Sequence, residues 1–310
     1  MDAFTKELLE KIVETNDLNA LDKLLKPKKR IQNKTLNFKS ALMLSGHQLK
    51  HLLKLDNINS DCIMLNLEDG VAVEKKPLAL RLVAYFLSLN LTSSKKLVVR
   101  INAIDEGGLE EIRFLNAYRP DAIRVPKICS IEDIEKVQEV LDENIELHLS
   151  IETKEGFSNI KSLQSNNRVK ALYLGVLDLL ADLGLDQSII DVNNPTIQYI
   201  LSEFLISSKI IGAYPVSFVY QDHKNMNEFK KWLSLEKKMG FKAKGCVSPT
   251  QADEVIKTFT LEKEQLRRAH IIVERFEKMK KQGITGFSDD EYGFIDEPIY
   301  KGALQTLSDH

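Results

Sequence analysis

Eight short apolar runs, separated by segments with helical periodicity, limit what this chain can fold into more than any other feature. The runs are Ala41–Leu44, Cys62–Leu67, Leu97–Ile101, Ala122–Val125, Leu147–Ile151, Ala171–Leu174, Ile210–Val216 and Gly245–Val247. Most are apolar without a break, which is typical of strands in a sheet that is covered on both faces. Eight such strand–helix units predict a parallel (β/α)₈ TIM barrel of the α/β class. A doubly wound open sheet is the alternative, but no GxGxxG or GxxxxGK[ST] supports a nucleotide site.

The segments between the runs carry helix signals. Ser130 is placed as a helix N-cap, with Asp133 three residues on and an apolar stripe that includes Ile134 and Val137. The segment from Asn225 to Met239 shows the same periodicity, so helices are expected between the strands.

The two ends of the chain differ from the middle. We expect an N-terminal helical extension over residues 1–38, made of one or two amphipathic helices, and the barrel over residues 39–260. Residues 261–310 predict a long helix, then a glycine-containing segment, then a short helix after Pro298. We interpret this last part as a mobile helical flap.

Charge and composition exclude several classes of partner. The formal net charge of −2 over 310 residues favours neither nucleic acid nor an anionic membrane. The basic run Lys26–Arg30 is short, and a solvated linker is preferred to a nucleic-acid patch. No secretory signal or membrane-length apolar run is found, and the three cysteines are odd in number and far apart. We therefore expect a cytoplasmic protein with free thiols.

Polar side chains follow nearly all of the predicted strands, at the end where a barrel of this kind places its chemistry. From the second run onward they are Glu68 and Asp69, Arg100 and Asn102, Lys127, Glu152 and Thr153, Asp178, Ser217 and Asp222, and Ser248. Any one of them is most simply a turn or cap residue. Together on one rim, they indicate an active site.

Three of these residues suggest a particular chemistry. Glu152 and Asp178 follow neighbouring strands, and two carboxylates without histidine or cysteine suit Mg²⁺. Arg100 could hold a substrate carboxylate or oxyanion through two hydrogen bonds. The six histidines show no metal-ligand spacing, and only His223, beside Asp222, stays a minor candidate. No GxSxG motif supports nucleophilic hydrolysis.

An ordered series of motifs runs through the same residues. The motifs are NLEDGVAVEKK, VVRINAID, IRVPKICSIEDI, SIETKEG, YLGVLDLLADLGL, GFKAKGCVSPTQ and GFIDEPIYKGA. From about Lys39 to Leu307 the chain resembles the citrate lyase β-subunit and malyl-CoA lyase family of Mg²⁺-dependent lyases, within the HpcH/HpaI aldolase–citrate lyase superfamily.

The resemblance implies a role for each matching residue. Glu152 and Asp178 match the two Mg²⁺ ligands, and Arg100 matches the arginine that contacts the substrate carboxylate or oxyanion in catalysis. Three more residues match the substrate side of the site, namely Glu68, Asp69 and Lys127. Asp296 matches a catalytic aspartate on a C-terminal flap, which in this family closes over a neighbouring subunit's barrel and transfers a proton.

The activity that the resemblance implies is carbon–carbon bond cleavage of a short 3-hydroxyacyl thioester of the malyl-CoA or citramalyl-CoA type. The products would be a 2-oxo acid and an acyl thioester, with Mg²⁺ as cofactor and coenzyme A or acyl-carrier protein as carrier. A homotrimer or homohexamer is expected. The alternatives are a citryl-acyl-carrier-protein lyase subunit, an aldolase on free 2-oxo acids and a non-catalytic homologue.

Several positions depart from the family pattern. Lys39 and Ser45 replace an arginine and a proline of the first strand, which in relatives helps to hold the thioester carrier. Asn66 replaces an aspartate, Leu177 a glutamate, and Ser248 stands where many relatives have histidine. The chain therefore lacks two of the family's usual residues on the strand that helps to hold coenzyme A, whereas both residues that match the Mg²⁺ ligands are present.

Overall fold

The computed structural model describes residues 2–27, 37–89, 95–163 and 168–308. The chain divides into two compact units, one up to Thr258 and one from Phe259 onward, and each is described by itself. Residues 28–30 of the basic run lie outside the described residues.

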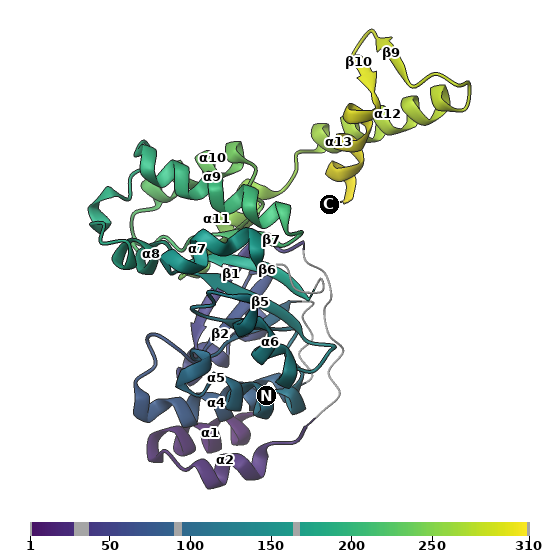
Figure 1. Ribbon diagram of the computed structural model, residues 1–310. Coiled ribbons are helices and arrows are strands. Elements are labelled where there is room, and N and C mark those ends of the chain that lie inside the picture. Colours follow the sequence, from purple (N-terminus) through teal and green to yellow (C-terminus); the bar gives the residue numbers. More distant parts are fainter. Residues whose placement is uncertain (1, 28–36, 90–94, 164–167, 309–310) are drawn as a thin grey trace. The chain divides into compact units, whose positions relative to one another are not determined.

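The first unit contains a closed barrel of eight parallel strands in sequential order, as predicted (Figure 1). The strands are β1 Ser40–Ser45, β2 Cys62–Asn66, β3 Lys96–Arg100, β4 Ala122–Val125, β5 Glu146–Ile151, β6 Val169–Leu174, β7 Tyr214–Ser217 and β8 Ala243–Cys246. The seventh strand is shorter than expected, because Ile210 still belongs to a helix and Gly212 turns the chain with a φ of 73°. The predicted apolar run therefore joined the end of a helix to a strand.

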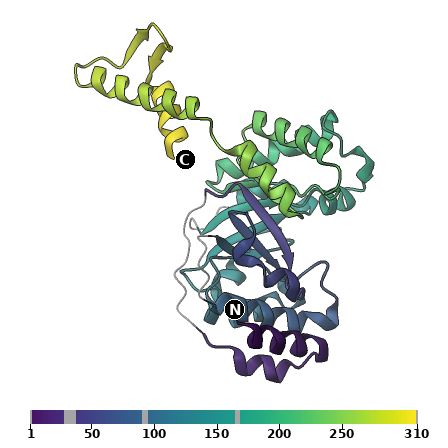
Figure 2. The same cartoon turned by 180° about the vertical axis from the view of Figure 1, so that it is seen from behind.

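Helices cover the outside of the barrel, as Figure 2 shows from behind. They are α3 Leu49–Leu52, α4 Lys76–Ser88, α5 Gly108–Leu115, α6 Ile131–Val140, α7 Lys154–Asn159, α8 Val176–Asp182, α9 Pro195–Ile210, α10 Met226–Met239 and α11 Pro249–Phe259. The predicted cap of α6 is confirmed, since Ser130 Oγ accepts the Asp133 N–H at 3.3 Å. The barrel interior is filled by side chains of mixed size, small ones such as Ala41 and Ala122 together with large ones such as Tyr173.

Two helices precede the barrel, α1 Ala3–Thr15 and α2 Leu18–Leu24. They bury Leu9, Ile12 and Leu21 and belong to the same compact unit as the strands. An ion pair of 2.7 Å joins Asp22 to Arg81 of α4. The N-terminal extension is thus attached to the barrel wall.

The second unit is built from α12 Lys263–Lys280, a hairpin of β9 Gly286–Asp289 and β10 Gly293–Asp296, and α13 Glu297–Ser308. Its core comprises Ala269, Ile272, Phe276, Ile295 and Ala303. The long helix and the helix around Pro298 were predicted, whereas the hairpin formed by the glycine-containing segment between them was not. Strands of four residues that are largely exposed leave too little alternation to be recognised in the sequence. No helix among the described residues is long and apolar enough to cross a membrane.

Candidate active site at the carboxyl ends of the strands

Asn66, the last residue of β2, shapes the turn that carries the acidic pair. Its side-chain amide donates to the Asp69 carbonyl oxygen, and its Oδ1 accepts the Glu68 N–H at 3.4 Å. Gly70 completes the turn with a φ of 83°, a conformation that glycine adopts without strain. An ionised aspartate at position 66 could not donate the first bond, so asparagine suits this turn.

Arg100, the last residue of β3, lies at the centre of the acidic groups. Its guanidinium contacts the Glu68 carboxylate, and its Nη2 lies 3.5 Å from Glu152 Oε2 and 3.8 Å from Asp69 Oδ2. Strand register explains this meeting, because Asn66 pairs with Arg100 across β2 and β3. The structure therefore brings together four residues that the sequence had placed at three different strand ends.

Glu68 is an unusual carboxyl group. Only 2% of the residue is exposed, and burial raises its pKa to about 7 despite the opposing charge of Arg100. Among the described residues, Glu68 Oε1 and Arg100 Nε have no hydrogen-bond partner. Buried polar atoms are normally satisfied, so these two mark a place where a ligand or water can bind.

Glu152 follows β5 directly and is held by backbone as well as by side chains. Its Oε1 accepts the Lys127 N–H at 3.0 Å, and its Oε2 faces Arg100. Gly175 leaves space for it, because a Cβ there would stand 2.5 Å from Glu152 Cβ and 2.8 Å from Oε2. The carboxylate is thus fixed at the start of α8, the helix that contains Asp178.

These groups line a cavity of about 370 Å³ at the carboxyl ends of the strands. Asp69, Arg100, Glu152 and Asp178 all contribute to its wall, together with apolar residues that include Met43. Asp178 lies in the first turn of α8. The volume is in the range of roughly 300–1,000 Å³ that is usual for small-ligand sites.

Lys127 lies differently from the other predicted site residues. Its side chain is exposed and does not line the cavity, whereas its backbone N–H binds Glu152. Its φ of 55° is in the left-handed region, which non-glycine residues adopt only rarely. Lys127 therefore reaches the site through its backbone, and its role in substrate binding stays a prediction.

Several other polar residues at the strand ends have local structural roles. Asn102 binds Glu111 of α5 through its backbone N–H and its side-chain amide, at 2.8 and 2.6 Å. Ser217 donates to Glu236, and Ser248 accepts the N–H of Gln251 at the start of α11. The simple interpretation of these residues as cap and packing groups agrees with their contacts.

Two cavity residues escaped the sequence analysis, Arg124 of β4 and Gln221 after β7. Arg124 stands inside the apolar run Ala122–Val125, and a cation in a buried strand was a signal that could have found it. Gln221 carries no comparable signal.

Asp296 lies in the second unit, at the end of β10. Its Oδ1 accepts the Ile299 N–H at 3.2 Å, so it caps the first turn of α13. The catalytic role that the resemblance implies for it stays a prediction.

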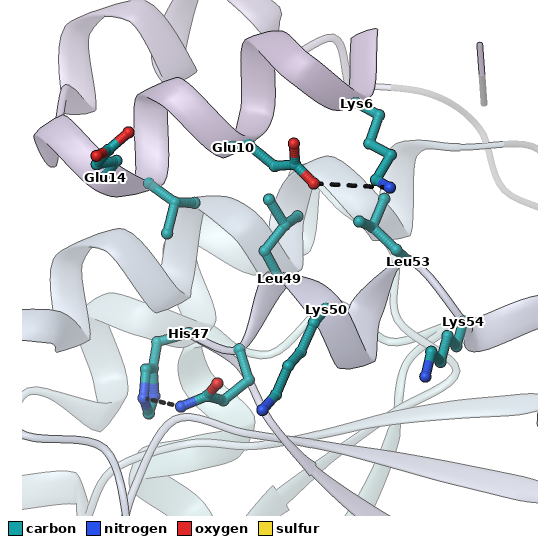
Figure 3. Close-up of a pocket in the computed structure, with 10 residues that line it drawn as sticks. Lys6, Glu10, Glu14, His47, Leu49, Lys50, Leu53 and Lys54 are labelled. Carbon is teal, nitrogen blue, oxygen red and sulfur yellow. Dashed lines mark hydrogen bonds and ion pairs between the residues drawn. The ribbon is translucent and has the colours of Figure 1, made fainter. Parts of the chain in front are cut away.

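A second cavity, of about 670 Å³, lies between α1 and the segment that follows β1. Figure 3 shows Lys6, Glu10 and Glu14 on one side and His47 and Leu49 on the other. Ser45, at the end of β1, lies 2.9 Å from His47 through its Oγ. Exposed Lys50 and Lys54 also line this cavity.

The donor set at the barrel mouth fits Mg²⁺. Glu152 and Asp178 supply carboxylate oxygens to one cavity, and Gly175 keeps the space beside Glu152 open. Among the described residues, no cluster of three or more His, Cys, Asp or Glu side chains has the geometry of a metal site. Two carboxylates suit an ion that keeps several waters and takes further oxygen ligands from a substrate.

The chain matches one known protein family over most of its length. The family model described as HpcH/HpaI aldolase/citrate lyase matches residues 39–249, which is most of the chain. The protein belongs to the HpcH/HpaI aldolase/citrate lyase family. The matched residues include every named residue of the cavity at the carboxyl ends of the strands, whereas α1, α2 and the second unit lie outside the match.

Other members of the HpcH/HpaI family are distant in sequence. The (3S)-malyl-CoA thioesterase of Cereibacter sphaeroides is 26% identical over 247 residues, covering 79% of this chain and 85% of that protein. The mitochondrial citramalyl-CoA lyase of Homo sapiens is 26% identical over 292 residues, covering 87% and 84%.

A solved structure shares the fold. The crystal structure of the protein CitE from Mycobacterium tuberculosis in complex with magnesium, acetoacetate and coenzyme A has a TM-score of 0.67 with this chain. The two are 21% identical, and the likeness covers 87% of this chain and 97% of that one.

Proposed function

We propose that this protein is a Mg²⁺-dependent carbon–carbon lyase that cleaves a short 3-hydroxyacyl thioester into a 2-oxo acid and an acyl thioester. The observation that carries the proposal is the meeting of Arg100, Glu152 and Asp178 in one cavity of the barrel. The names of the relatives support the substrate class, since two of them act on malyl-CoA or citramalyl-CoA.

The bond changes of this reaction balance without an oxidant or reductant. The 3-hydroxyl group loses its proton, and the C2–C3 bond breaks as the hydroxyl carbon becomes a carbonyl. The electron pair of that bond forms the enolate of the acyl thioester, which takes up a proton at C2. The protein must therefore bind the carboxylate next to the new carbonyl and move one proton.

Arg100 is our candidate for binding that carboxylate and the developing negative charge. Its guanidinium has a free Nε among the described residues and is oriented by Glu68, with Glu152 and Asp69 nearby. Buried cationic donors of this kind stabilise an oxyanion more than water does. Mg²⁺ held by Glu152 and Asp178 would supply Lewis-acid stabilisation of the substrate oxygens.

For the carrier, we propose coenzyme A or acyl-carrier protein. The cavity beside the end of β1 contains Lys50 and Lys54, which suit the phosphates of either carrier, beside the ion pair of Lys6 and Glu10. Ser45 stands at the end of β1 in place of the family's proline. Assays with each carrier distinguish between the two.

The decisive experiment is a cleavage assay of the purified protein with Mg²⁺ and, separately, with EDTA. Malyl-CoA, citramalyl-CoA and citryl thioesters are compared, and 2-oxo acid and free thiol are measured in parallel. A lyase releases oxo acid without free thiol, whereas a thioesterase releases thiol without oxo acid. Thiol release alone, or no Mg²⁺-dependent turnover with any thioester, would overturn the proposal.

Proton transfer by Asp296 is tested by Asp296→Asn in the same assay. Asparagine is as good a helix N-cap as aspartate, so α13 keeps its cap and the melting temperature should stay unchanged. Loss of a general acid–base group should lower kcat by about 10²- to 10⁴-fold. Full activity at saturating substrate would remove Asp296 from the mechanism.

A further inference from the structure

Arg124 is a second guanidinium in the barrel cavity, and the proposed chemistry does not yet use it. The residue is 6% exposed and lines the same cavity as Arg100, which is its register partner on the neighbouring strand. Unlike Arg100, it forms no ion pair with a carboxylate among the described residues, so its guanidinium can bind a ligand.

The orientation of Arg124 is set by neutral groups. Its Nε donates to Ser150 Oγ at 2.8 Å, and its guanidinium lies over the Tyr173 ring with 4.4 Å to the centroid. Ser150 and Tyr173 belong to β5 and β6, so three strands hold the group in place. A guanidinium fixed in this way loses little entropy when it binds a planar anion.

The terminal nitrogens of Arg124 are available. Among the described residues, no hydrogen bond reaches them and no carboxylate lies within 4.0 Å of them. Arg100, in contrast, contacts Glu68 and has Glu152 within 3.5 Å. Burial lowers the pKa of Arg124 to about 10, which leaves it charged at neutral pH.

Burial and the charge of Arg100 lower the pKa of Arg124 and outweigh the charges of Glu152 and Glu68, which favour the cation from a distance. A buried cation without an ion pair is costly for the protein and favours binding of an anion. Under the proposed function, Arg100, Glu152 and Asp178 already account for the carboxylate and oxygen next to the scissile bond. A monocarboxylic oxo acid would leave Arg124 without a partner.

We propose that Arg124 binds a second carboxylate on the oxo-acid half of the substrate, so that the enzyme releases a dicarboxylic 2-oxo acid. This inference rests on the proposed function and narrows its substrate class. It predicts preference for thioesters of the citryl type over those that release pyruvate or glyoxylate. Arg124 is then the residue that determines this specificity.

The test is calorimetric binding of oxaloacetate and of pyruvate, two oxo acids that differ by one carboxylate, to the full-length protein with Mg²⁺. The wild type should bind oxaloacetate more tightly by about 10- to 100-fold, the usual gain from hydrogen bonds to a charged group. Arg124→Met should remove this preference while changing the pyruvate Kd by less than about 3-fold, and Arg124→Lys should restore part of it. Arg113→Met, an exposed position on α5, serves as the matched control and should bind like the wild type.

Three results would overturn the inference. They are equal wild-type affinity for the two oxo acids, equal loss of both in Arg124→Met, and binding of neither at millimolar concentration. If Arg124→Met does not fold, Arg124→Gln, which can still donate to Ser150, takes its place. A preference for oxaloacetate that depends on Arg124, in a protein that cleaves no thioester, would keep this subsite and reject the lyase function.

Discussion

Strands β3 and β5 carry ionisable residues at both ends, and the two ends are built in opposite ways. At the start of the strands, Lys96 Nζ lies 2.8 Å from Glu146 Oε2, which also lies 3.1 Å from His148 Nε2. At the other end, Arg100 Nη2 lies 3.5 Å from Glu152 Oε2, beside a cavity. The first end is a closed network, and the second is an open one.

This difference separates charges that hold the barrel from charges that can act on a ligand. At the closed end, His148 also lies 3.2 Å from the Tyr173 hydroxyl through its other ring nitrogen, so both of its nitrogens have partners. At the open end, Glu68 Oε1 and Arg100 Nε lack partners among the described residues. Polar groups with hydrogen-bond partners stabilise a fold, whereas buried donors and acceptors without partners can still bind a ligand.

The largest effect is expected at the closed end. Glu146→Gln removes the charge opposite the buried Lys96 ammonium and should lower the free energy of unfolding by about 3–5 kcal/mol. Urea denaturation measures this change. Exposed Glu135→Gln on α6 is the control, with an expected change within about 0.5 kcal/mol. Equal stability of the two variants would show that the closed end does not hold the barrel.

The next effect is expected at the open end. Glu152→Gln should lower kcat for thioester cleavage by about 10²- to 10³-fold, as removal of one group that stabilises transition-state charge does. It should also weaken binding of Mg²⁺ in calorimetry. Because the Lys127 N–H can still bind an amide oxygen, the melting temperature should fall by only a few degrees. Unchanged kcat would contradict the assignment.

A smaller effect should appear with acid. Burial opposes ionisation of Glu146, but the His148 hydrogen bond and the Lys96 charge outweigh it and lower its pKa below 4.5. The unfolded chain therefore takes up a proton at this position at a higher pH than the folded chain does. The stability that Glu146 contributes is present above pH 4.5 and is lost as the pH falls further. Urea titrations at pH 7 and pH 3.5 should show the gap between wild type and Glu146→Gln narrowing.

The smallest effect is expected for Lys127→Ala. The side chain is exposed and the contact with Glu152 comes from the backbone, so kcat/KM should change by less than about 3-fold. Steady-state kinetics decides this. A loss of 10-fold or more would show that the Lys127 side chain takes part in the substrate site.

Much of the fold could be predicted because its signals are local. Seven of the eight predicted runs agree with a strand to within two residues at each end. Ser130 caps α6, as its spacing indicates. The hairpin of the second unit could not be predicted, because its strands are short and exposed. Of the residues predicted at the strand ends, Arg100, Glu152 and Asp178 line one cavity and Glu68 contacts Arg100, since parallel strands in a barrel end on the same side.

The sequence by itself determined the order of strands and helices and the residues that follow each strand, because periodicity and capping depend on neighbours along the chain. Only the tertiary structure decided which of those residues share a cavity. A continuous apolar run does not tell which side chains face the barrel axis, so Arg124 was overlooked. Closure of the barrel brought Arg100 against Glu68 and left Arg124 without a carboxylate partner among the described residues, and no local pattern contains either fact.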